Sequence, residues 1–214
     1  MLAVVFLEMI PESMRVAYER PFMLDPEAAR LPAAAAQVLL LVLIGYLLVH
    51  FFEHTLAPHF HFGEETHLHE MAASHVGYTA VLGLVIHTFF DGVAISSGLL
   101  VSRSLGILIF VAVFLHKLPE GFTVASLMMA SGQGKRRAFY SSAILGAATL
   151  AGVGLMFIWT AQVGIALPIS AGVALYVAAS DLIPEVNHEP GPGMAILVFL
   201  GVALMFTMKL IFQV

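Results

Sequence analysis

The chain has 214 residues, of which 60% are hydrophobic and 11% charged, and its mean hydropathy is +0.95. Soluble domains carry roughly 25% charged residues, so this composition belongs in a lipid bilayer rather than in water. The net charge of −5 gives no basic surface for nucleic acid, and the absence of cysteine excludes disulfides and thiolate metal sites.

Seven apolar segments follow one another along the chain. The first, from Met1 to about Arg15, is too short to cross a hydrocarbon core of about 30 Å, and a charged connection, Ser13–Arg30, follows it. Six complete spans are predicted at Ala33–Phe52, Val76–Val101, Gly106–Ala130, Ala138–Thr160, Val163–Ile183 and Met194–Val214. Continuous apolar runs without period-two alternation argue against strands. We therefore predict an all-α, polytopic membrane helix bundle that forms a single domain over residues 1–214.

The connections between these spans are short, with one exception. Ser102–Ser104 predicts a tight hairpin, Ser131–Arg137 a Gly/Lys/Arg turn, and Asn187–Gly193 a Pro/Gly turn. The exception is a His-rich loop over residues 53–75, whose histidines are His54, His59, His61, His67, His69 and His75. Their irregular spacing predicts a weak, metal-collecting segment rather than a rigid cage, although a solvated tether has the same composition.

Four pairs of metal-capable side chains, each spaced four residues apart, lie within or at the ends of the apolar segments. They are Glu8/Glu12, His87/Asp91, His116/Glu120 and Asp181/Glu185. Residues at i and i+4 share one face of a helix, so each pair can point at one site. An ionisable residue at membrane depth costs about 2.5–3.5 kcal/mol on insertion scales, and so many of them together indicate a cation pathway. The first and last pairs have a second interpretation, as charges that solvate helix ends.

Proline precedes the second member of three of these pairs, at Pro11, Pro119 and Pro184. Proline has no backbone N–H, so it frees a carbonyl that can face an ion or water. The motif H-x-x-x-[DE]-G occurs twice, starting at His87 and at His116, in neighbouring spans that must run antiparallel. Inverted repeats with proline-interrupted helices are typical of secondary transporters.

The two imidazoles and two carboxylates of the central pairs form an N₂O₂ ligand set. Such a set suits Zn²⁺ and also accepts Fe²⁺, Mn²⁺, Co²⁺ or Cd²⁺, whereas Mg²⁺ and Ca²⁺ sites do not need histidine. Two carboxylates neutralise the double charge of the ion. Gly92 and Gly121, which follow the motif acids, predict a close approach of the two helices that carry the site.

These motifs resemble those of the ZIP family of divalent-metal transporters, of the bacterial type. The likeness lies in His87–Gly92, in His116–Gly121, in the P-E signatures at Pro11 and Pro184, and in the His-rich loop. The resemblance implies an eight-helix bundle with a two-metal site between its fourth and fifth helices, and often a homodimer. No counterpart of the first helix precedes Met1, so about seven membrane helices are expected here.

Carried over residue by residue, the resemblance places His87, Asp91, His116 and Glu120 at ligand positions, with Glu8 and Glu12 near the pathway. Two further positions depart from the family pattern. Thr88 replaces the usual asparagine, and Lys117 replaces the usual acid. An ammonium can occupy the place of a second cation, so we predict one bound metal rather than two. Lys117 can also serve as a structural ion-pair partner of Asp91 or Glu120, and the two interpretations overlap.

The predicted function is transport of divalent transition-metal cations, with zinc uptake into the cytoplasm as the leading case. The protein is expected in the plasma membrane or bacterial inner membrane, with the metal ion and the lipid bilayer as partners and no nucleic acid. No enzyme is expected, because H-E-x-x-H, G-x-S-x-G and a cysteine nucleophile are all absent. The alternatives are a half-carrier that binds metal without transporting it and an intramembrane metal-dependent hydrolase.

Overall fold

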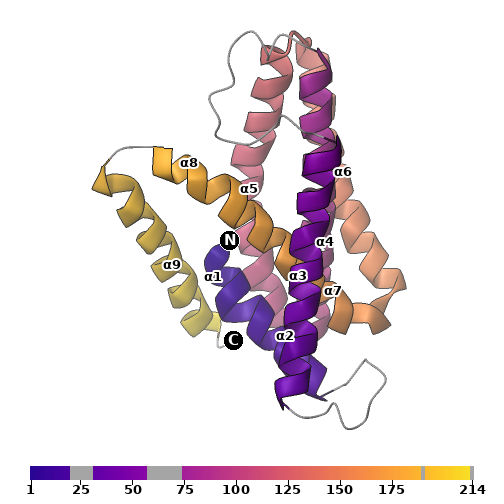
Figure 1. The fold of residues 1–214 in the computed structure, drawn as a ribbon, viewed down its shortest axis with the longest axis vertical. Helices are drawn as coiled ribbons and strands as arrows, with labels where there is room; N and C mark the ends of the chain where they lie inside the picture. The colour runs from indigo at the N-terminus through magenta and orange to yellow at the C-terminus, as the bar shows by residue number, and fades with distance from the viewer. Residues whose placement is uncertain (20–30, 57–73, 189–190, 213–214) are drawn as a thin grey trace.

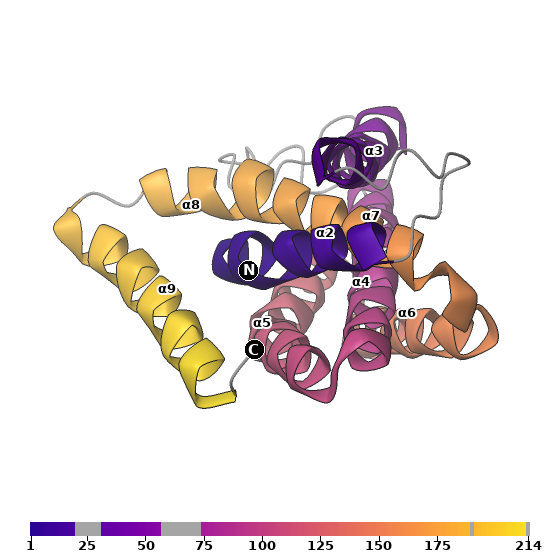
Figure 2. The same cartoon turned by 90° about the horizontal axis from the view of Figure 1, so that it is seen from below.

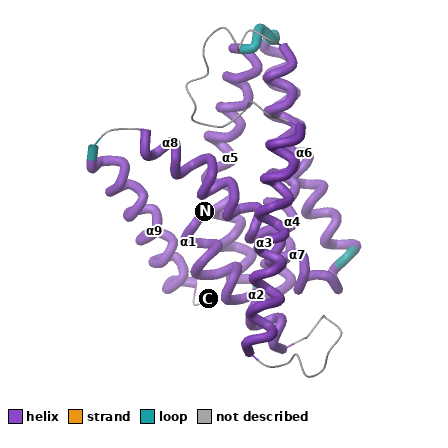
Figure 3. The backbone as a smooth tube through the Cα atoms, viewed as in Figure 1, coloured by secondary structure: helices purple, strands orange, loops and turns teal. Residues whose placement is uncertain are grey.

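A computed structural model describes residues 1–19, 31–56, 74–188 and 191–212, and within these ranges the chain is almost wholly helical and contains no strand (Figures 1 and 3). The all-α prediction is thus confirmed. The elements in chain order are α1 (Leu2–Val4), a π-helical turn (Val5–Met9), α2 (Ile10–Glu19), α3 (Leu31–Leu56), α4 (Ser74–Val101), α5 (Arg103–Ala130), α6 (Lys135–Ile158), a 3₁₀ turn (Thr160–Gln162), α7 (Val163–Tyr176), a second π-helical turn (Val177–Leu182), α8 (Ile183–His188) and α9 (Pro192–Phe212).

Six helical segments in the described ranges are long and apolar enough to cross a membrane. They are Pro32–Thr55, Gly77–Val101, Arg103–Ala130, Lys135–Ile158, Thr160–Ser180 and Pro192–Ile211. These six match the six complete spans predicted from the sequence. The partial first segment is helical as well, over residues 2–19, so helix extends into the stretch expected to be the charged connection.

Helix continues through that stretch because its polar groups find partners within it. The Ser13 hydroxyl donates to the Met9 carbonyl at 2.6 Å. The Arg15 guanidinium pairs with Glu12 and with Glu19, one turn away on either side. Pairs at i,i+3 and i,i+4 support a helix, and here they carry it to Glu19.

Both outer proline motifs break the α-helix in the same way. One π-helical turn ends two residues before Pro11 and the other ends two residues before Pro184. A π-turn inside an α-helix is uncommon and is frequent at functional sites. Pro119 differs, because it lies inside the uninterrupted helix α5.

Glycine fixes the closest helix crossing next to the candidate site, where α4 packs extensively on α6. A Cβ at Gly92 would lie 1.9 Å from the Thr149 carbonyl oxygen, and one at Gly152 would lie 2.0 Å from the Phe89 oxygen. The predicted role of Gly92 was therefore assigned to the wrong neighbour, since it admits α6 rather than α5. Gly121 has nothing within 4 Å of its Cβ position, so its missing side chain is not what brings α5 against α4.

A second crossing of the same kind joins α3 to α7. A Cβ at Gly45 would lie 2.1 Å from the Ile169 oxygen, and one at Gly172 would lie 1.9 Å from the Val42 oxygen. Because neither glycine carries a side chain, the two backbones meet directly, as small residues allow in membrane helices. The bundle is thus built on two tightly crossed pairs, α3 with α7 and α4 with α6.

The α4–α5 hairpin is as tight as the sequence predicted. Ser102 is the one residue between the two helices, and its hydroxyl accepts a hydrogen bond from the Leu105 amide at 3.1 Å. Beside this turn the backbones of Gly98 and Gly106 approach closely. The hairpin makes α4 and α5 antiparallel, which brings the two H-x-x-x-[DE]-G motifs side by side.

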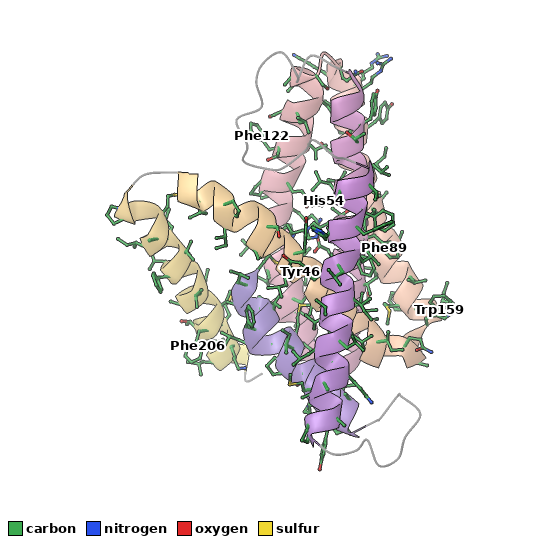
Figure 4. All side chains as sticks on the ribbon, viewed as in Figure 1. Tyr46, His54, Phe89, Phe122, Trp159 and Phe206 are labelled. Carbon is green, nitrogen blue, oxygen red and sulfur yellow. The ribbon has the colours of Figure 1, made fainter. Side chains whose placement is uncertain are left out.

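The C-terminal helix stands apart from this compact core. Figures 1 and 2 show α8 and α9 as an arm that diverges from the other helices, with the N-terminal helix between them and the bundle. Only 6% of the α9 span is buried, against 56% of the α4 span. Large apolar residues such as Phe199 and Phe206 are exposed along α9, as suits a surface that faces lipid (Figure 4 labels Phe206).

Candidate metal site

Three metal-capable side chains converge at the middle of the α4–α5 hairpin. His87 and Asp91 come from α4 and His116 from α5, and one ligand atom of each lies within 4.8 Å of the others. His116 Nε2 is 3.2 Å and His87 Nε2 is 3.6 Å from the same carboxylate oxygen, Asp91 Oδ2. His87 and Asp91 are almost fully buried. This is the one group of three such residues in the described part of the chain.

The ring of His116 is oriented by a backbone hydrogen bond. Its Nδ1 lies 3.0 Å from the Ala112 carbonyl oxygen, which can only accept, so we assign the proton to Nδ1. Its Nε2 then faces Asp91 Oδ2 at 3.2 Å, in the position from which it can ligate an ion held beside that carboxylate. Metal-ligating histidines are commonly oriented by this type of contact.

Lys117 inserts its ammonium between the two carboxylates of the hairpin. Its Nζ lies 2.7 Å from Asp91 Oδ2 and 2.7 Å from Glu120 Oε2. Glu120 therefore lies next to the three-residue group but outside it, joined to Asp91 through the ammonium. The interpretation of Lys117 as an ion-pair partner is confirmed, and its charge occupies the position where a cation would bridge the two acids.

Two buried polar atoms at this site have no hydrogen-bond partner. They are Nδ1 of His87 and Oε1 of Glu120. A buried polar atom left unpaired costs free energy, so such atoms are uncommon away from functional sites. Both belong to residues with a second ring nitrogen or carboxylate oxygen directed at the cluster. The donor set thus has unused capacity for a bound ion or its water.

The remaining member of the predicted ligand set on α4 is Thr88. Its side chain is fully buried, and its hydroxyl donates to the Val85 carbonyl at 3.1 Å. The proton of the hydroxyl is thus committed to the helix that carries it, while the oxygen lone pairs stay available.

The structure places Glu8 and Glu12 apart from this cluster. Glu8 is buried, and Lys209 of α9 lies 3.0 Å from its Oε1. Glu12 is partly exposed and pairs with Arg15 on the outer face of the same helix. The two carboxylates of this pair therefore meet different partners in different surroundings.

Parts of two predicted features lie outside the described residues. The backbone at Asp181 and Glu185 is described as helix, but the side chains of this pair are not. The His-rich loop falls largely on residues 57–73, which are likewise outside the described ranges. Its first acid, Glu53, accepts a hydrogen bond from the Tyr176 hydroxyl at 2.9 Å and so links α3 to α7.

Sequence reasoning missed two sets of polar contacts. Lys209 was not singled out, although the sequence shows it as the one charged residue between Met194 and Val214. A single charge in an apolar span indicates a polar partner elsewhere in the fold. The second set ties α3 to α7 and to the π-helical turn that follows it, with the Tyr46 and Ser180 oxygens 3.2 Å apart (Figure 4 labels Tyr46 on α3). No sequence spacing predicts a contact between residues so far apart along the chain.

Comparison with known proteins supports a common origin for most of this chain. The sequence model of a family described as ZIP Zinc transporter matches residues 63–209. Zinc transporter ZIP9-A of Xenopus laevis is 28% identical over 171 residues, which cover 72% of this chain and 56% of that protein. Zinc transporter ZIP9 of Micropogonias undulatus is 29% identical, over 68% of this chain and 50% of its own length.

A second kind of relative is the human zinc transporter SLC39A7, which is 31% identical over 136 residues. That match covers 58% of this chain and 29% of the human protein. The chain thus spans about half the length of the first two relatives, and less of the third. No solved structure matches it.

Proposed function

This chain belongs to the ZIP zinc transporter family, and on that premise we propose that it carries divalent transition-metal ions, zinc first, across a membrane. One observation supports the proposal above the others. His87, Asp91 and His116 converge within 4.8 Å in two antiparallel helices that are long enough to span a bilayer. Imidazole nitrogen and carboxylate oxygen are ligands that Zn²⁺ takes in proteins, and the absence of thiolate leaves Fe²⁺, Mn²⁺, Co²⁺ and Cd²⁺ as competitors.

We propose that the ion binds first to His87, Asp91 and His116, and that Glu120 then completes its coordination. Glu120 Oε2 lies 2.7 Å from the Lys117 ammonium, so the carboxylate reaches the ion when that ammonium withdraws. Two carboxylates then neutralise the ion in an apolar surrounding. The displaced Lys117 ammonium stays close enough to repel a second cation, and for this reason the site takes one metal ion rather than two. Thr88 adds a hydroxyl oxygen at the edge of this set.

Zinc uptake into the cytoplasm is the direction we propose, through a plasma membrane or bacterial inner membrane. The chain is an integral membrane protein, since it belongs to a transporter family and has six helices of membrane-spanning length. We treat residues 1–214 as one transport domain with the 53–75 loop inside it. A homodimer in the membrane is part of the same proposal.

The direct test is zinc flux into proteoliposomes that contain the purified chain. His87→Ala and Glu120→Ala should each abolish saturable flux, because each removes a proposed ligand. His50→Ala is the matched control, since this histidine lies exposed on α3 outside the cluster and should leave flux unchanged.

The same preparation separates the alternatives. A half-carrier binds one zinc ion through His87 but shows no flux, and a hydrolase turns over a substrate without moving zinc. Flux that survives loss of His87 and Glu120 together would overturn the proposed site.

A further inference from the structure

The N-terminal helix contains a hydrogen-bonding gap at Pro11. The carbonyl of Leu7 lies four residues before this proline, which has no N–H to donate to it. The helix accommodates the proline with a π-helical turn over Val5–Met9. An unpaired carbonyl at membrane depth costs several kcal/mol, so it needs another donor.

Lys209 supplies that donor from the far end of the chain. Its Nζ donates to the Leu7 carbonyl at 2.9 Å and lies 3.0 Å from Glu8 Oε1. The Glu8 side chain is 4% exposed and the Lys209 side chain 30% exposed, so a largely buried carboxylate contacts a partly exposed ammonium. The ammonium thus serves the carbonyl that the proline break leaves without a backbone donor, and it also pairs with the buried carboxylate beside that carbonyl.

The position of this contact is important because α9 is otherwise loosely held. A cavity of about 420 Å³ lies between α9 and the rest of the molecule. Its walls include Met1 on the N-terminal segment, His116 and Pro119 on α5, Ile183 on α8 and Met205 on α9. The helix α9 therefore closes one side of an apolar space that reaches a candidate metal ligand, and Lys209 holds it there.

We propose that Lys209 is a positioning residue of the carrier, whose ammonium ties α9 to the proline break of the N-terminal helix and thereby keeps α9 in place as one wall of the cavity beside His116. It touches none of the proposed metal ligands. Its part in transport rests on the proposed function, whereas the tie itself is a property of the fold and can be tested without transport.

The tie is tested by the distance between two spin labels on the purified chain. The chain has no cysteine, so Phe199→Cys on α9 and Trp159→Cys at the end of α6 give two unique sites, both exposed (Figure 4 labels Trp159). Lys209→Met should at least double the width of the distance distribution. Lys209→Arg should preserve the narrow distribution, because a guanidinium can donate to the carbonyl and the carboxylate together.

Two further variants make this result decisive. Thr207→Val is the matched control, since the Thr207 hydroxyl bonds within α9 to the Ala203 carbonyl and should not affect the distribution. Glu8→Gln removes the other partner without changing its size, so it should broaden the distribution even if Lys209→Met fails to fold. Narrow distributions in both Lys209→Met and Glu8→Gln would overturn the proposal.

Zinc flux, normalised to the folded protein in the liposomes, adds a second readout, because simple destabilisation lowers the maximal rate only through the amount of folded carrier. Lys209→Met should lower the maximal rate at least fivefold and change KM less than twofold, because the ligands stay in place. Lys209→Arg should restore at least half of the maximal rate. If the unmodified chain moves no zinc, the proposed function fails while the spin-label result still decides the role of Lys209. A fall in the maximal rate accompanied by an equally large change in KM, without rescue by Lys209→Arg, would overturn the positioning role.

Discussion

The α4–α5 hairpin and the N-terminal helix with α9 each bring a buried carboxylate against a lysine inside an apolar region. At the hairpin, Lys117 lies 2.7 Å from Asp91, and at the N-terminal helix Lys209 lies 3.0 Å from Glu8. The hairpin adds two imidazoles directed at the same carboxylate oxygen, whereas the Glu8 pair adds a backbone carbonyl, that of Leu7. The imidazoles, not the buried charge, distinguish a transition-metal site from a structural tie.

The two regions also differ in how firmly they are held. The site helix α4 meets α6 at crossings where Gly92 and Gly152 leave no room for a methyl group. In contrast, α9 is almost wholly exposed, and Lys209 contributes a polar contact rather than close packing. The structure thus sets a fixed ligand geometry beside a loosely held helix, which leaves room for one part to move against the other.

The largest expected effect comes from removing the carboxylate charge in each region without changing its size. Asp91→Asn should reduce zinc flux by about a hundredfold or more, since even outer-shell partners of a metal ligand are worth 10–100-fold. Glu8→Gln should reduce it less than tenfold, because Glu8 lies outside the cluster. Flux measured in proteoliposomes at matched protein content checks both, and equal losses would erase the distinction between the two regions.

Methyl groups added at glycines should separate the tight region from the loose one. Gly92→Ala and Gly152→Ala each force a Cβ to about 2 Å from a backbone oxygen, and overpacking of this kind costs about 1–3 kcal/mol. Gly201→Ala on α9 is the control, because nothing lies within 4 Å of its Cβ position. Thermal unfolding in detergent, followed by intrinsic fluorescence, should place the first two well below the control. A similar midpoint for all three would show that the crossing relaxes freely.

The side chain at position 117 should decide how many ions the hairpin holds, because a second ion needs both the loss of the ammonium and an added ligand. Lys117→Asp replaces the ammonium with a carboxylate beside Asp91 and Glu120, so bound zinc should rise from one ion to two per chain. Lys117→Met is the matched control and should remain at one, since it removes a charge without adding a ligand. Metal analysis of the dialysed proteins measures the ratio. Two ions in the unmodified chain would refute the single-metal prediction.

The smallest effect is expected at the exposed pair on the N-terminal helix. The Arg15 side chain is 47% exposed and pairs with Glu12 and Glu19 on its own helix. Exposed pairs of this kind contribute about 0–1 kcal/mol, so Arg15→Ala should shift the unfolding midpoint little. A loss as large as that of Gly92→Ala in the same assay would mean that this face is buried in the membrane assembly.

Much of the fold could be predicted from the sequence because its governing property is local. A span is defined by its length and apolar content, and six of these were located to within a few residues. The end of α2 was missed because its polar residues resemble a loop in composition. Their pairs with Arg15 become visible only when the segment is placed on a helix.

The candidate site was predicted in part for the same reason. His87 with Asp91 and His116 with Glu120 share helix faces at a fixed spacing, and the short turn at Ser102 forces the two faces together. Gly92 was assigned to the wrong neighbour, because a glycine shows that a helix can approach but not which helix does.

By itself, the sequence determined the number and order of the membrane helices and the chemical types of the metal ligands, because both are set by stretches of a few turns. Tertiary structure decided which groups on different helices meet. Lys209 and Leu7 are 202 residues apart and come together through packing, and Lys117, whose pair with Glu120 is local, reaches Asp91 through the crossing of α4 and α5. Contacts of that range depend on how whole helices pack, and no spacing along the chain encodes them.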